Sequence, residues 1–86
     1  MAFLLTDFEK HAAAVVLQRA QAYLAEKRIF KLSQTGNRVE AQVSGSELYR
    51  VRIEMEGEQI KEAYCDCPYD QGGICKHVAG VLYTLR

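Results

Sequence analysis

Residues 64–86 read YCDCPYDQGGICKHVAGVLYTLR, and they hold all three cysteines of the 86-residue chain and one of its two histidines. These four side chains form two pairs, C-x-C and C-x-H, with seven residues between them: Cys65, Cys67, Cys75 and His77. Structural zinc is held in proteins by four thiolate or imidazole ligands at the corners of a tetrahedron. The spacing therefore predicts one structural zinc ion bound by residues 65–77.

The expected local structure lets the two pairs meet. Cys65 and Cys67 share a face if the chain is extended there, because residues two apart in a strand point the same way. Cys75 and His77 would lie about 200° apart within a regular helix. Both can bind one ion only if Cys75 precedes or caps the helix and His77 lies in its first turn. Four protein ligands also leave no open position on the metal, so we expect a structural and not a catalytic zinc.

A disulfide, a catalytic cysteine or an iron–sulfur cluster would account for these residues less well than zinc. The odd number of cysteines and the lack of a secretory leader favour a reducing, cytoplasmic compartment over a disulfide. A nucleophilic cysteine activated by His77 would need an orienting third group, and the sequence shows none. Three unrelated cysteines would not be expected to gather within thirteen residues, and an iron–sulfur cluster would favour a fourth cysteine. Asp66 and Asp70 could also bind metal, but we expect them to shape the turn or face solvent.

The N-terminal part of the chain has a helical period. Thr6 and Glu9 fit a capping box, and apolar residues recur at helical spacing at Ala13, Val16, Leu17, Ala20, Tyr23 and Leu24. This pattern predicts a helix over residues 6–28, with His11 on its surface.

Residues 29–64 alternate between apolar and polar side chains and are interrupted by three glycine-containing turns. They predict an antiparallel meander of three to four strands with one face packed on the first helix. A second helix over 77–86 is predicted by apolar residues at i, i+3, i+4 and i+7, namely Val78, Val81, Leu82 and Leu85. We therefore expect a single α+β domain over residues 1–86. Because no capping residue follows this helix, we also expect further chain beyond Arg86.

Composition excludes several classes of function. Eleven basic and eleven acidic residues give a formal net charge of zero, which does not produce the strongly basic field of a non-specific nucleic-acid binder. No apolar run approaches the roughly 18 residues of a membrane helix. The chain also lacks a phosphate-binding loop, a carboxylate pair and a catalytic triad. We therefore expect no enzyme activity, no membrane partner and no small-molecule substrate for these residues.

The residues CDCPYDQGGICKHVAGVL resemble the SWIM zinc finger, whose signature is C-x-C-x(n)-C-x-H. The four ligand positions, the proline after the second cysteine and the apolar run after the histidine all agree with that family. The resemblance implies zinc bound by Cys65, Cys67, Cys75 and His77, preceded by strands and, in bacterial members, by a helix. It also implies a module for DNA binding or protein interaction, near the N-terminus of a bacterial SNF-type helicase.

For DNA binding, the candidates are basic side chains and one aromatic residue in the strands and the zinc loop: Lys31, Arg38, Arg50, Arg52, Tyr69 and Lys76. Basic side chains bind phosphates, and an exposed tyrosine can stack on a base. Nearby acids leave an ordinary solvated sheet face as an open alternative: Glu54, Glu56, Glu58 and Glu62. The neutral charge also keeps open a second function, an interaction module that docks on another protein or on another part of its own chain.

Overall fold

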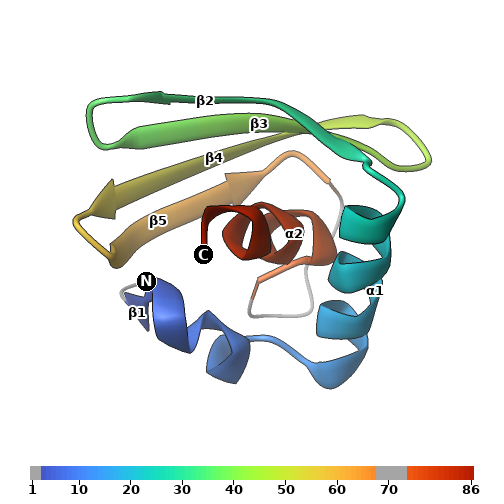
Figure 1. Cartoon of the computed structure of the whole chain (residues 1–86), viewed down its shortest axis with the longest axis horizontal. Helices are drawn as coiled ribbons and strands as arrows, with labels where there is room; N and C mark the ends of the chain where they lie inside the picture. Colours follow the sequence, from blue (N-terminus) through green and yellow to red (C-terminus); the bar gives the residue numbers. More distant parts are fainter. Residues whose placement is uncertain (1–2, 68–73) are drawn as a thin grey trace.

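The computed structural model describes residues 3–67 and 74–86. Within them, five strands form one antiparallel sheet in the order β1-β5-β4-β3-β2, accompanied by a 3₁₀ helix and two α-helices (Figure 1). The elements are β1 (Phe3–Leu4), η1 (Leu5–His11), α1 (Ala14–Ala25), β2 (Ile29–Thr35), β3 (Arg38–Ser44), β4 (Leu48–Glu56), β5 (Gln59–Cys65) and α2 (Lys76–Leu85). The predicted α+β class, the antiparallel meander and the C-terminal helix are confirmed.

The meander follows directly from the alternation in the sequence. On β3 and β4 every second side chain is buried, namely Val39, Ala41, Val43, Tyr49, Val51, Ile53 and Met55. The tight turns before β3 and before β5 contain Gly36 and Gly57, which have φ values of 59° and 61°. That left-handed region costs little for glycine and is unfavourable for most residues with a side chain. These glycines therefore fix where one strand ends and the next begins.

The helix that packs on the sheet is α2, and this corrects the prediction that the first helix does so. Residues His77 to Leu82 of α2 are all buried, so this helix must pack against other elements on several sides. It lies at the centre of the molecule, with the sheet on one side and α1 and η1 on others (Figure 1). A Cβ atom on Gly80 would come within 2.6 Å of Ile29 Cδ1. Glycine at this position thus lets α2 approach the start of β2 closely.

The predicted helix over 6–28 is wrong for residues 6–13. Residues 5–11 form a 3₁₀ helix, and extended backbone at Ala12 and Ala13 separates it from α1. This break lets η1 and α1 lie separately against α2, and Phe8 packs edge-to-face on Tyr83 with ring centroids 4.8 Å apart.

The predicted capping box does not form either. Neither helical element that begins in this part of the chain has a side-chain cap, and the Glu9 carboxylate instead accepts hydrogen bonds from Tyr83 Oη and Arg86 Nη1, both at 2.7 Å. Two residues of β1 extend the sheet beyond the expected three to four strands by pairing with β5.

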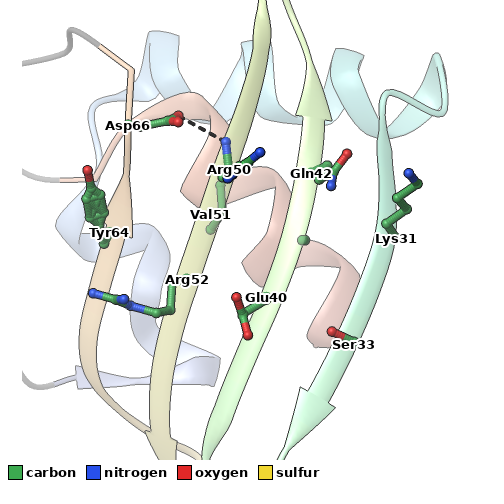
Figure 2. A pocket seen from close by; sticks show the side chains of 10 residues that line it. Lys31, Ser33, Glu40, Gln42, Arg50, Val51, Arg52, Tyr64 and Asp66 are labelled. Atoms are coloured by element: carbon green, nitrogen blue, oxygen red, sulfur yellow. Dashed lines mark hydrogen bonds between the residues drawn. The ribbon is translucent and has the colours of Figure 1, made fainter.

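The opposite face of the sheet has no helix on it among the described residues (Figure 2). We call this surface the open face, and the surface under α2 the buried face. In the described ranges, no helix has the length and apolar character that crossing a membrane requires.

Candidate metal centre

The four predicted zinc ligands come from a strand end and a helix start. Cys65 is the last residue of β5, and Cys67 follows two residues later. Cys75 is the N-cap of α2 and His77 is its second residue, which is the placement that the spacing required. Their ligand atoms all lie within 4.8 Å of one another. The structure therefore brings all four predicted side chains together.

The distances within the cluster fit a single zinc ion. His77 Nδ1 lies 3.6 Å from Cys65 Sγ and 3.9 Å from Cys75 Sγ. Bonds of about 2.0 to 2.3 Å in a tetrahedron separate neighbouring ligand atoms by about 3.3 to 3.8 Å. The cluster thus needs only a small contraction to enclose the ion. Three sulfurs and one imidazole nitrogen are also a donor set that zinc prefers.

The start of α2 provides electrostatic support for the site. Three thiolates, a neutral imidazole and Zn²⁺ carry a net charge of minus one, which the positive end of a helix dipole stabilises. Cys75 lies at that end, and its sulfur accepts a hydrogen bond from the backbone N–H of Val78 at 3.5 Å. Lys76, considered as a second source of positive charge, has its Nζ 5.3 Å from the centre of the Tyr23 ring.

Cys65 and Cys75 interact with each other through a hydrogen bond. A hydrogen bond with Cys65 lowers the pKa of the Cys75 thiol to about 4, and contacts with His77 and the Val78 N–H act in the same direction. The same hydrogen bond and burial raise the pKa of Cys65. The hydrogen bond thus favours Cys75 as the thiolate and leaves the proton on Cys65. Zinc binding would release this proton, because a thiol that coordinates zinc is deprotonated.

Two tyrosines hold the His77 ring in place. His77 is only 3% exposed, and Tyr49 stacks on it with centroids 4.4 Å apart at 28°. Tyr23 lies against it at 5.6 Å and 57°. The Tyr49 hydroxyl forms a hydrogen bond with Ser46 Oγ at 2.9 Å. Sequence reasoning placed Tyr23 and Tyr49 only in apolar patterns, because periodicity cannot show that two buried stripes meet at one histidine.

Residues 49–86 match the family model of the SWIM zinc finger. This match and the cluster of three cysteines and one histidine support a SWIM zinc finger in this segment. The matched region begins at Tyr49, which stacks on His77, and includes β4, β5, the four clustered residues and α2. Searches of curated proteins and of solved structures found no match.

The SWIM finger is a non-catalytic type of module, and its cluster is consistent with one structural zinc ion. Cys65, Cys67, Cys75 and His77 would hold that ion and so would fasten the end of β5 to the start of α2. When bound, the metal supplies a cross-link between these elements and no open coordination position for a substrate.

The predicted DNA-contacting residues are not all in one place. Lys31, Arg50 and Arg52 line a hollow of about 660 Å³ on the open face (Figure 2). Arg38 borders a neighbouring hollow, and its Nη2 is 3.3 Å from Glu54 Oε1. Lys76 begins α2, on the buried side of the sheet. Tyr69 lies outside the described residues, as does Asp70.

Two further residues of this hollow were missed as part of a binding surface, Tyr64 and Asp66. Alternation along β5 would have placed Tyr64 on the same face as the buried Ile60, whereas the register shift between β4 and β5 turns it to the open face beside Arg52. Asp66 shapes the turn, one of the two roles expected of it: its Oδ1 accepts a hydrogen bond from the Arg50 backbone N–H at 2.9 Å.

Proposed function

We propose that this SWIM finger binds DNA through the open face of its sheet. The observation that supports it is that Lys31, Arg50 and Arg52, from β2 and β4, all line one hollow that no described helix covers. Such side chains bind phosphate groups and hold a nucleic acid in position.

The zinc site would act by stabilising the conformation of this surface. Asp66 lies between Cys65 and Cys67 and binds the backbone of Arg50 twice, through its carboxylate at 2.9 Å and through its own N–H at 3.4 Å. A metal that fixes both cysteines therefore also fixes Asp66, and with it the part of β4 that carries Arg50 and Arg52. DNA binding and zinc binding would then be lost together.

The charge of the hollow limits the expected affinity. Three cations share the hollow with the carboxylates of Glu40 and Asp66, a surplus of one positive charge. Arg38 adds little because Glu54 pairs with it. Affinity for nucleic acid falls with salt in proportion to the number of phosphates neutralised. We therefore expect modest affinity with a shallow salt dependence, from about two or three phosphate contacts.

The test is binding of a fluorescently labelled DNA by the zinc-loaded protein, measured by anisotropy at about 50 and 200 mM salt. Changing both Arg50 and Arg52 to alanine should weaken binding about tenfold and flatten the salt dependence. The matched control changes Lys10 and Arg19 to alanine, which removes two exposed cations from η1 and α1. This control should bind like the unchanged protein. Absence of binding at the lower salt concentration would overturn the proposal.

We further propose that the module is part of a bacterial SNF-type helicase in the reducing cytoplasm. Any ATPase or helicase activity would then belong to a different part of that protein. The resemblance to helicase-associated SWIM fingers supports this, and so does the odd number of cysteines, which is unfavourable for a disulfide framework. A helicase core in the same reading frame would support the proposal, and a frame that encodes a different type of enzyme would contradict it.

An interaction module without nucleic-acid contact is the second candidate. It is favoured by the zero net charge and by β2, a strand at the edge of the sheet with partly exposed Phe30 and Leu32. Exposed edges can pair with another chain. Two results together would favour this function. The unchanged protein would bind no DNA, and Leu32→Lys would abolish its association with a neighbouring domain.

A further inference from the structure

We infer that the open face selects single-stranded nucleic acid, and that Tyr64 is the platform on which an unpaired base stacks. This inference rests on the proposed function, because the same hollow and the same cations hold the phosphates. It adds the class of nucleic acid and a residue that sequence reasoning had not assigned.

Tyr64 has the position of a stacking residue. It is 49% exposed and lies at one side of the hollow, beside Arg52 (Figure 2). The two residues face each other across the pairing of β4 with β5, and Arg52 Cζ is 5.5 Å from the centre of the Tyr64 ring. A base on the ring would therefore have its phosphate within reach of a guanidinium.

The other side of Tyr64 has no neighbouring strand among the described residues. β1 is the only described strand on that side of β5, and it pairs with Gln59 and Ile60 alone. The second half of β5, which carries Tyr64, therefore forms an unpaired edge within the part of the chain that the structure describes. A flat base can approach the ring from this direction without displacing a strand.

The expected contributions of charge and of base stacking to the binding energy favour a single strand over a duplex. Duplex DNA is held largely through phosphates, and a surplus of one positive charge in the hollow is little for that task. Stacking of an unpaired base on an aromatic side chain contributes roughly 1 to 3 kcal/mol and depends little on sequence. In a duplex the bases stack on one another and are not available to Tyr64. The stacking energy corresponds to a preference for single strands of about 5- to 150-fold.

A purely structural role for Tyr64 makes different predictions. In a structural role, the exposed cation–π contact of Tyr64 with Arg52 would add only slightly to stability. In that case, replacing the ring would lower the melting temperature slightly and would weaken single-strand and duplex binding equally. Only a stacking role changes the ratio of the two affinities.

The experiment measures dissociation constants of the zinc-loaded protein for labelled oligonucleotides of about 12 nucleotides, as single-stranded DNA, duplex DNA and single-stranded RNA. Three proteins are compared: unchanged, Tyr64→Leu and Tyr64→Phe. Leucine keeps an apolar side chain without an aromatic face, whereas phenylalanine keeps the face and loses only the hydroxyl. Melting temperatures of all three establish that each is folded.

We expect the unchanged protein to bind the single strands at least about fivefold more tightly than the duplex. Tyr64→Leu should remove most of this preference, and Tyr64→Phe should keep it. Tight binding of both the DNA and the RNA single strand would support the inference, because stacking and phosphate contacts do not need the 2′-hydroxyl.

Two results separate the failure of this inference from failure of the proposed function. Equal binding of duplex and single strand, unchanged in Tyr64→Leu, would overturn the inference and leave DNA binding intact. No binding to any of the three oligonucleotides would overturn both.

Discussion

The two faces of the sheet differ although they are built from the same strands. Neighbouring residues of β4 show the contrast: Val51 and Ile53 are buried under α2, whereas Arg50 and Arg52 point to solvent on the open face. The buried face carries apolar side chains and the metal cluster. The open face carries charges of both signs and an exposed tyrosine. The proposed recognition surface is thus opposite the face that carries the core and the metal cluster.

One residue connects the two faces. Asp66 lies between two clustered cysteines on the buried side and binds the backbone of Arg50 on the open side. The two faces are therefore not fully independent of each other. A change at the metal should affect both faces, whereas a change on the open face should affect recognition alone.

Removal of zinc should have the largest effect. Structural zinc contributes roughly 10 to 16 kcal/mol of apparent binding free energy in zinc-finger peptides, more than the net stability of many domains. Because α2 lies between the sheet, α1 and η1, losing its anchor should expose all of them. We expect a chelator, or Cys75→Ser, to abolish cooperative melting and most helical circular dichroism.

His11→Ala is the control for this prediction, because His11 is exposed and stacks only on Phe3 among the described rings. It should melt like the unchanged protein and retain its zinc. A domain whose circular dichroism and melting temperature are the same with and without chelator would show that the cluster is not a structural zinc site.

Paired substitutions on β4 test the contrast between faces directly. Ile53 is fully buried, so Ile53→Ala should cost about 2 to 5 kcal/mol of unfolding free energy. Arg52→Ala, one position away on the open face, should change it by about 0.5 kcal/mol or less. Chemical denaturation of both zinc-loaded variants measures the difference. A cost for Arg52→Ala close to that of Ile53→Ala would mean that the open face also carries stability.

Glu9→Gln should have the smallest effect. Hydrogen bonds from Arg86 and Tyr83 lower the pKa of Glu9. Its contribution is therefore present above the pKa of the unfolded chain and disappears as the pH falls through the lower folded value. Glu9→Gln should lower the melting temperature slightly at neutral pH, and the difference from the unchanged protein should vanish in acid. A difference that stays constant down to strongly acidic pH would contradict this assignment.

Local patterns predicted much of the molecule. Alternation predicted the strands of the meander, glycines marked the turns, and the i, i+3, i+4, i+7 residues of 78–85 predicted α2. The spacing of Cys65, Cys67, Cys75 and His77 was enough to predict that they meet, because it left only one compatible arrangement of strand end, helix cap and first turn.

The structure of the N-terminal segment was harder to predict from the sequence, and the reason is physical. Residues 6–28 have the composition of one helix, but Leu5 and Phe8 must reach α2 while Phe3 pairs with Ile60 on β5. These contacts are distant in sequence, and they outweigh a local helical preference of only a few tenths of a kcal/mol per residue. Glu9 likewise binds residues more than seventy positions away instead of capping its own helix.

By itself, the sequence determined which residues alternate, where the chain turns and which four side chains can hold zinc, since these depend on neighbours along the chain. Only the tertiary structure decided that α2, and not the first helix, covers the sheet, and that Tyr49 and Tyr23 enclose His77. It also gathered Lys31, Arg50, Arg52 and Tyr64 on one open face. Such groupings depend on the order of strands in the sheet and on the packing of its faces, neither of which a local pattern contains.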